Sequence, residues 1–454
     1  DRADVQVPVG LGREAGVNLE LGRRAKVTLY DIKNKIVALK NELESKGYIV
    51  SDISSDCDAF VINTCSVTNM ADRKSRQMLH KAKKNNPESI VVATGCYVQT
   101  KEQEAIEDLA IDIIIGNNRK HELVELINDY IKAHDKSMDA VLDINDGNQD
   151  YEELYIEKTA EHTRAFIKVQ DGCNQFCTYC IIPFARGRVR SRNAEDVINE
   201  VKRLVAHGFK EVVLTGIHLS SYGVDTDDSL LHLIQLVNEI DGIERIRLGS
   251  LEPRIVTEEF VQALSAMPKV CPHFHLSLQS GCDATLQRMN RRYDTAEYEN
   301  GCRILRKYYE HPAITTDVIV GFPGETEEEF AQTKEYLERI HFYEMHIFQY
   351  SKREGTKAAV MPNQVLEPVK KARSGELLAL EKKMSEEFRE YYIGKTVTAL
   401  MEENYEYKGE TYCVGYTQEY VKVAVKTTEN LSNRFIKGKI TQRLLDDIYV
   451  MVEF

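Results

Sequence analysis

The sequence predicts an α/β protein of three successive domains, at about 25–145, 159–390 and 393–454. In the first two domains short β-rich runs alternate with helical stretches, a pattern typical of βαβ crossovers and parallel sheets. After Gly394 short β-rich runs follow one another without helices, which is typical of a small antiparallel β-barrel. A length of 454 residues also exceeds that of one ordinary domain.

The composition indicates buried cores and a metal site. Hydrophobic residues make up 43% of the chain, and no apolar run approaches the roughly 18 residues of a membrane span. Residues 1–24 lack the pattern of a secretory signal and have no assigned role. Of the ten cysteines, three fall within eight positions, which favours metal binding in the reducing cytoplasm over a disulfide scaffold. The net charge of −13 argues against general coating by nucleic acid but allows a local basic surface.

The first domain is expected to carry two cysteines at one edge of a parallel sheet. Cys65 and Cys96 each follow a β-rich run directly. Parallel strands place their carboxyl ends at one edge, so we expect the two cysteines to be neighbours. The predicted strands are Val27–Tyr30, Phe60–Thr64, Ile90–Thr94 and Ile111–Ile115, and the predicted helices include Ile36–Lys46 and Ala71–Lys84.

The second domain is expected to be a partial (β/α)6 barrel that follows an acidic linker, Asp143–Glu161. Six β/α units in about 190 residues fit an incomplete barrel, since the eight-unit form needs about 250. A charged helix, Pro368–Tyr391, follows the last unit. The predicted strands are Phe166–Gln170, Glu211–Thr215, Arg245–Gly249, His273–Leu278, Thr316–Val320 and Glu344–Phe348, with helices such as Ala194–His207 and Glu327–Ile340 between them.

A C-x3-C-x2-C motif, formed by Cys173, Cys177 and Cys180, follows the first strand of this barrel. Three thiolates can hold three irons of a [4Fe–4S] cluster and leave the fourth iron without a protein ligand. The open iron can bind S-adenosylmethionine (SAM), which is then cleaved to a carbon radical. A structural zinc site would need a fourth ligand, and the next 80 residues offer no ligand pair but only isolated histidines such as His207 and His218.

The segment Cys173–Gly187 resembles the signature of the radical SAM methylthiotransferase family. The resemblance runs from about Lys26 to the C-terminus, and the last domain is similar to the TRAM-like RNA-binding module of these enzymes. Thr215–Gly223 and Tyr350–Ala359 most resemble the branch that acts on N6-threonylcarbamoyladenosine in tRNA. Other matching segments are Thr215–Leu219, Leu276–Gly281, Arg288–Arg292 and Gly321–Thr326.

This resemblance implies transfer of a methylthio group to C2 of that adenosine, next to the anticodon. The implied cofactors are SAM and two [4Fe–4S] clusters. The implied partners are a tRNA anticodon stem-loop and a flavodoxin- or ferredoxin-like electron donor, without a membrane. No single catalytic residue is assigned. The residues expected to contact SAM are Thr215, Gly216, Ser250, Glu252, Gln279 and Gly321.

The family places the second cluster on three cysteines of the first domain, and Cys65 and Cys96 match two of them. The third should follow the opening strand, where Tyr30 is followed by Asp31 and no cysteine. Cys57 precedes its strand and should lie at the opposite edge of the sheet. We therefore hypothesise that a short cysteine-bearing loop belongs after Tyr30 and is missing from the sequence.

Three basic segments are candidates for phosphate contact. Four arginines alternate after the cysteine motif and are expected to point to one side, towards a phosphate backbone. A helix rich in Lys and Arg follows Cys65, although such a charge run is often only a solvated face. The last domain combines cations with tyrosines, which suits stacked RNA bases. The residues are Arg186, Arg188, Arg190 and Arg192; Arg73, Lys74, Arg76, Lys81, Lys83 and Lys84; and Lys422, Arg434, Lys437 and Lys439 with Tyr412, Tyr416 and Tyr420.

Three functions compete. The first is a tRNA-modifying methylthiotransferase. The second keeps this chemistry but acts on another modified adenosine, such as the isopentenyl one, or on a ribosomal protein side chain. The third is a non-catalytic iron–sulfur protein, which is disfavoured because a redox carrier does not need an iron left open to SAM.

Overall fold

The computed structural model describes residues 2–7, 25–31, 43, 49–50, 57–66, 69–133, 141–146, 150–152 and 163–453. It divides into two compact units. Unit 1 comprises residues 1–159, 171–190 and 351–356, and unit 2 comprises residues 160–170, 191–350 and 357–454. No helix among the described residues is both long and apolar enough to cross a membrane.

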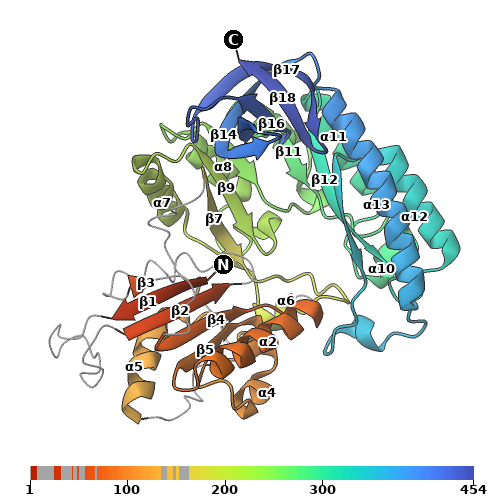
Figure 1. Cartoon of the computed structure of the whole chain (residues 1–454). Helices are drawn as coiled ribbons and strands as arrows, with labels where there is room; N and C mark the ends of the chain where they lie inside the picture. The colour runs from red at the N-terminus through yellow and green to blue at the C-terminus, as the bar shows by residue number, and fades with distance from the viewer. Residues whose placement is uncertain are drawn as a thin grey trace. The chain divides into compact units, whose positions relative to one another are not determined.

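Unit 1 contains a six-stranded sheet with helices on both faces (Figure 1). The strands pair in the order β1-β2-β4-β5-β6, with β3 also paired to β2. They are β1 (Arg2–Val7), β2 (Ala25–Asp31), β3 (Ile49–Val50), β4 (Ala59–Thr64), β5 (Ile90–Gly95) and β6 (Ile113–Ile115). The helices of this unit are α2 (Asn69–Asn85), α3 (Cys96–Thr100), α4 (Glu102–Glu107), α5 (Leu123–Ala133) and α6 (Ile182–Ala185).

The central strands of this sheet are apolar throughout because both of their faces are covered. Val61 and Val92 pack on one side against the core of α5, whereas Phe60 and Val91 pack on the other side against α2. β1 was not predicted. It pairs antiparallel with β2, so the sheet is parallel except at this edge. The predicted helix Ile36–Lys46 lies outside the described residues except for Leu43.

Unit 2 contains a curled half-barrel sheet of parallel strands. One part has the order β10-β9-β7-β8 and the other β11-β12-β13, and isolated parallel bridges, such as Leu251 to Leu276, join β10 to β11. The strands are β7 (Arg164–Asp171), β8 (Arg190–Ser191), β9 (Glu211–Gly216), β10 (Arg245–Leu248), β11 (His273–His275), β12 (Ala313–Val320) and β13 (Glu344–Gln349).

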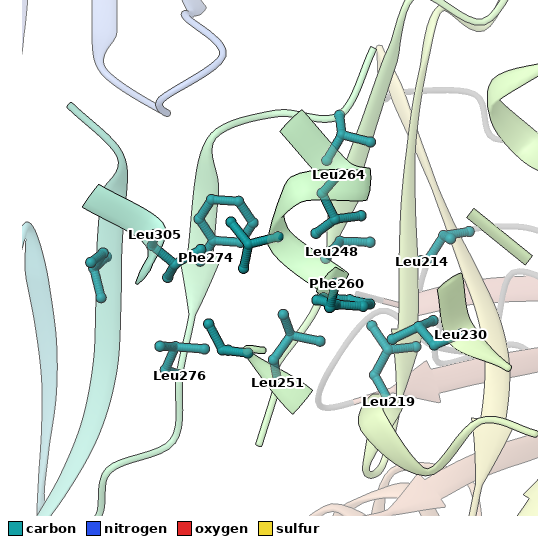
Figure 2. Close-up of a cluster of buried hydrophobic side chains, with 14 of the residues drawn as sticks. Leu214, Leu219, Leu230, Leu248, Leu251, Phe260, Leu264, Phe274, Leu276 and Leu305 are labelled. Carbon is teal, nitrogen blue, oxygen red and sulfur yellow. The ribbon is translucent and has the colours of Figure 1, made fainter. Parts of the chain in front are cut away.

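Helices cover the outer face of this sheet, and their apolar side chains form one continuous core with it. Figure 2 shows part of this core, where Leu214, Leu248 and Phe274 from the strands meet Phe260 and Leu264 from a helix. The helices are α7 (Ala194–Ala206), α8 (Leu230–Asn238), α9 (Glu258–Ser265), α10 (Asp283–Arg288), α11 (Thr295–Tyr308), α12 (Glu327–Ile340) and α13 (Glu367–Glu390).

The last 60 residues form a closed five-stranded barrel with the order β14-β15-β16-β18-β17. Its strand pairs are antiparallel except β16 with β18, which is parallel and departs from the purely antiparallel expectation. The strands are β14 (Thr396–Tyr407), β15 (Glu410–Tyr416), β16 (Lys422–Lys426), β17 (Phe435–Leu445) and β18 (Ile448–Glu453).

This barrel packs against the amino-terminal ends of the half-barrel strands through buried arginines. Arg245 donates to the carbonyl oxygens of Tyr416 and Thr398 at 2.8 and 2.7 Å, and Arg247 donates to the carbonyl of Gln418 at 2.9 Å. Glu211, only 2% exposed, accepts from Arg247 Nε at 3.0 Å. The contacts with the barrel therefore lie at the amino-terminal ends of the strands and not at their carboxyl ends.

The tyrosines expected to stack on RNA take part in this packing instead. The rings of Tyr416 and Tyr420 stack at 4.7 Å, and the guanidinium of Arg164 lies 4.9 Å from each ring centroid. Tyr412 is buried in a separate cluster with Val414, Ala424 and Ile448, apart from the barrel core that contains its neighbour Cys413. These contacts speak against stacking of RNA bases on the three rings, because Tyr412 is buried and Tyr416 and Tyr420 are only partly exposed.

Replacing Glu211 with Gln should lower the free energy of unfolding by about 3–5 kcal/mol, because it leaves buried arginines without their counter-charge. Burial opposes ionisation of Glu211, but the charges of Arg247, Arg164 and Arg245 outweigh it and lower its pKa. The stabilisation should thus be present above the ordinary glutamate pKa of about 4.3 and be lost as the pH falls through the lowered value.

Urea unfolding of the full chain at several pH values measures this effect. The matched control is Glu244→Gln, since Glu244 forms only a half-exposed pair with Lys210 at 3.7 Å. That substitution should cost no more than about 1 kcal/mol. Equal losses in the two variants would contradict the assigned role of the buried network.

Candidate functional site: two cysteine edges and a row of strand ends

The cysteine loop begins at Gly172, directly after β7, and its backbone requires glycine. Gly172 has φ of +71°, and a Cβ there would lie 1.7 Å from the carbonyl oxygen of Arg188. The loop closes through hydrogen bonds from Cys173 N–H to the Gly187 carbonyl at 3.0 Å and from Cys180 N–H to the Cys177 carbonyl at 2.9 Å. The glycine therefore lets two distant backbone segments meet.

The three thiols of this loop fit a [4Fe–4S] cluster. Cys173 and Cys177 are each 9% exposed, and Cys180 is partly exposed. The backbone N–H of Gln175 points at Cys173 Sγ at 3.5 Å, a contact that favours a thiolate sulfur. Three cysteines within eight positions of one loop match the three-cysteine ligand set that leaves one iron open.

The arginines after the motif do not form the expected phosphate-binding row. Arg186 and Arg190 both approach the Asp171 carboxylate, at 3.7 and 3.6 Å, and Arg192 is buried in an ion pair with Glu200. Only Arg188 of the four is exposed. The expectation fails because α6 and a turn at Gly187 interrupt the extended segment on which the alternation depends.

Cys65 and Cys96 lie where the sequence predicts them, after the neighbouring parallel strands β4 and β5. Thr64 and Gly95, which precede them, are register partners. Gly95 has φ of +100°, and a Cβ there would come within 2.5 Å of the Thr64 carbonyl oxygen. The close approach of the two strand ends therefore depends on this glycine. Cys65 N–H donates to Ser75 Oγ at 3.0 Å.

Within unit 1 the structure places Cys96 beside the cysteine loop. Asn117 Nδ2 donates to the Ala185 carbonyl at 2.7 Å and lies 3.8 Å from Cys96 Sγ. Burial opposes ionisation of the thiol, but the nearby charges of Arg186 and Lys120 outweigh it and lower the pKa of Cys96. The role of Arg186 was missed from the sequence, because its partner is 90 residues away.

No third cysteine joins Cys65 and Cys96. β2 runs without a break through Tyr30 and Asp31, which pair with Ile62 and Asn63 of β4. The structure therefore has no break between Tyr30 and Asp31, and the missing cysteine-bearing loop stays a prediction. Cys57 is buried at the opposite end of β4, as expected. The described residues supply two of the three thiolates that a second cluster needs, so the fit here is incomplete.

The residues expected to contact SAM line up along the carboxyl ends of the strands in unit 2. Thr215 and Gly216 end β9, and the other four follow β10, β11 and β12. Two of them have left-handed backbone conformations, Gln279 with φ of +71° and Gly321 with φ of +72°. A non-glycine residue held at positive φ is uncommon and is often found at binding sites. The four are Ser250, Glu252, Gln279 and Gly321.

Gln170 organises one end of this row and was missed from the sequence. It is fully buried at the end of β7, and its Oε1 accepts from the backbone N–H of His218 at 2.8 Å. His218 also bonds Ser221 Oγ at 2.6 Å, and burial with the nearby Arg291 charge lowers its pKa to about 4. His218 is therefore neutral at pH 7, and it holds the turn after β9 in place.

Comparison with known proteins gives the family. Residues 167–337 match the Radical SAM superfamily, and residues 33–116 match a family described as "Uncharacterized protein family UPF0004". The chain is 40% identical over 399 residues to the threonylcarbamoyladenosine tRNA methylthiotransferase MtaB of Bacillus subtilis, covering 87% of this chain and 88% of that protein. The chain belongs to the radical SAM methylthiotransferase family. The [4Fe–4S] cluster and SAM are thus its cofactors.

Other relatives agree with this assignment. A tRNA-2-methylthio-N(6)-dimethylallyladenosine synthase of Pelotomaculum thermopropionicum is 40% identical over 370 residues, covering 79% of this chain and 82% of that protein. Among solved structures, the radical SAM methyltransferase TsrM of Kitasatospora setae superposes with a TM-score of 0.55 at 14% identity, covering 74% of this chain and 76% of that one. The structural likeness supports the fold.

Replacing Gly172 with Ala should remove iron from the cysteine loop, since the added Cβ collides with the Arg188 backbone. The iron content and visible absorbance of anaerobically reconstituted protein would measure the loss. Gly355→Ala is the matched control, because Gly355 also has positive φ, +81°, but its Cβ would meet only Ile181 Cδ1 at 3.7 Å. Full iron loading of the Gly172 variant would contradict the proposed loop geometry.

Proposed function

We propose that this protein transfers a methylthio group to C2 of N6-threonylcarbamoyladenosine beside the anticodon of tRNA. The observation that carries the proposal is the loop of Cys173, Cys177 and Cys180 in a chain that is 40% identical to a curated enzyme of this name. The supporting geometry is the row of polar and glycine residues along the carboxyl ends of the neighbouring strands.

The three loop cysteines hold the [4Fe–4S] cluster, and the strand-end residues bind SAM. When bound, the cluster supplies the electron that cleaves a carbon–sulfur bond of SAM. The backbone at Thr215 and Gly216 is suited to receive the amino group of the methionine part. Ser250, Glu252 and Gln279 would offer polar side chains to the rest of SAM, and the Gly321 turn would take its adenine.

We assign Cys65 and Cys96 to the second cluster, which needs a third ligand besides these two thiolates. The charge of Arg186 near Cys96 favours the thiolate form that binds iron. In this proposal the second cluster belongs to a first domain at 25–145. A six-unit radical SAM barrel follows at 159–390, and a TRAM-like module at 393–454. A flavodoxin- or ferredoxin-like electron donor and a cytoplasmic location stay predictions.

The anticodon stem-loop is proposed to contact the exposed cations of the last domain. Lys437 and Lys439 alternate on β17 and are both exposed, as is Arg434 just before this strand. Alternating residues of a strand share one face, so the two lysines present a continuous positive edge. This surface replaces the three tyrosines as the candidate RNA contact.

A second candidate function is methylthiolation of the isopentenyl (dimethylallyl) adenosine of tRNA, because a relative of that name is also 40% identical. The threonylcarbamoyl branch is favoured by the longer alignment, 87% of the chain against 79%. A ribosomal protein side chain has no such support among these relatives.

Replacing Cys177 with Ala should abolish SAM cleavage in a folded protein, because two thiolates cannot hold the cluster with its open iron. Anaerobically reconstituted protein would be assayed for 5′-deoxyadenosine under reducing conditions. Cys302→Ala is the control, since Cys302 is buried in the hydrophobic core on α11. Cleavage by the Cys177 variant at the wild-type rate would refute the role of the loop.

The enzyme should methylthiolate tRNA that carries the threonylcarbamoyl group and should reject tRNA that carries the isopentenyl group. A site built to hydrogen-bond a carboxylate and a hydroxyl leaves its own polar groups unpaired against an apolar substituent, which can cost a factor of about 10⁴ in kcat/KM. Mass spectrometry of nucleosides from both tRNAs after reaction measures the preference. Equal turnover would overturn the choice of branch but not the methylthiotransferase activity.

A further inference from the structure

A group of potential metal ligands lies outside the cysteine motifs, on three neighbouring strands of unit 2. His275 is on β11, Asp317 is on β12 and His346 is on β13. One ligand atom of each residue lies within 4.8 Å of the other two. Across the part of the chain that the structure describes, this is the one set of three or more His, Cys, Asp or Glu that meets this limit.

Strand register brings the three side chains to one face of the sheet. His275 is the register partner of Thr315, and Asp317 is the register partner of His346. Thr315 and Asp317 are two residues apart on β12, so they point to the same side. The alternate positions point the other way and pack into the helix-covered core. These positions are Phe274, Leu276, Ile314, Val318, Met345 and Ile347.

Contacts within the group orient its donor atoms. His275 Nε2 lies 3.3 Å from Asp317 Oδ2, and the rings of His275 and His346 stack with centroids 5.6 Å apart. The other ring nitrogen of His275, Nδ1, lies 2.9 Å from the hydroxyl oxygen of the buried Thr315. A metal-ligating histidine is usually fixed in this way, by a hydrogen bond from the nitrogen that does not bind the metal.

The surrounding charge also suits a cation. Glu344 is the register partner of Thr315 and brings a second carboxylate to the same face. Arg389 lies near Glu344 and acts on its charge, whereas Arg164 and Arg247 pair with Glu211. His275 and Asp317 side chains are 13% and 27% exposed, and His346 is exposed, so an ion can reach them.

We propose that His275, Asp317 and His346 bind a divalent transition-metal ion on the inner face of the half-barrel sheet. Two imidazoles and one carboxylate suit Zn²⁺, Fe²⁺, Co²⁺ or Mn²⁺, whereas Mg²⁺ and Ca²⁺ favour sets made entirely of oxygen ligands. Three protein ligands leave at least one coordination position open. The ion therefore accepts a further oxygen or nitrogen ligand from a molecule that enters this face.

Zinc binding to the full-length protein, with its iron–sulfur cysteines loaded beforehand, tests the proposal. X-ray absorption at the zinc edge should show nitrogen and oxygen neighbours at about 2.0–2.1 Å with the scattering pattern of imidazole. A shell of sulfur at about 2.3 Å would place the zinc on cysteines and overturn the proposal. Absence of bound zinc at micromolar concentration would overturn it equally.

Variants provide the second measurement. After equilibrium dialysis, His346→Ala and Asp317→Asn should each hold one zinc equivalent fewer than the wild type. The control His341→Ala, which removes an exposed histidine paired with Glu387 at 2.8 Å, should hold the wild-type amount. Iron content and melting temperature identify a variant that fails to fold. In that case the X-ray absorption spectrum of the wild-type protein alone tests the proposal. Equal zinc in all four proteins would mean that His275 and Asp317 form only a hydrogen-bonded pair.

Discussion

Parallel strand pairing determines where this protein places its reactive groups. In unit 1 it brings the ends of β4 and β5 together, so that Cys65 and Cys96 follow register partners. In unit 2 the same rule collects the residues after β9, β10, β11 and β12 along one edge of the curled sheet. Each set is assembled from segments far apart in the sequence, and the backbone hydrogen bonds of the sheets hold the sets in place.

Glycine at two positions allows the close backbone approaches on which these edges depend. At Gly172 and Gly95 any side chain would collide with a carbonyl oxygen of another segment. The opposite edge of unit 2 is held differently, by the buried charges of Glu211, Arg245 and Arg247. Because the C-terminal barrel covers these charges, deletion of the barrel would expose them. Such a deletion would therefore destabilise the half-barrel as well as remove the surface proposed to bind RNA.

Much of this arrangement could be predicted from the sequence, because it depends on local signals. The helix Glu327–Ile340 was predicted with its observed bounds, since Thr326 and Glu329 form a capping box at its start. The alternating strands and the cysteine motif are likewise local patterns. The radical SAM family assignment is confirmed by the relatives.

Other features depend on partners that no local pattern reveals. The sequence pattern of Arg186 and Arg190 predicts phosphate contacts, but in the structure both side chains approach the carboxylate of Asp171. The sequence likewise predicts that Tyr416 and Tyr420 stack on bases, but in the structure the guanidinium of Arg164 lies over both rings. β1 was missed although Ala3, Val5 and Val7 alternate with polar residues, because this short run shows its role only through its pairing with β2. In each case the role of the residues is set by a contact with a segment that is distant in the sequence.

The most direct test of the proposed activity is nucleoside analysis of tRNA from cells that lack their own threonylcarbamoyladenosine methylthiotransferase and express this chain. The 2-methylthio derivative of threonylcarbamoyladenosine should appear in these cells, and it should be absent when the Cys177→Ala variant is expressed at the same level. Tracing by mass spectrometry identifies the nucleoside by its added mass. If tRNA remains unmodified, or the methylthio group appears only on another nucleoside, the account of the substrate is contradicted.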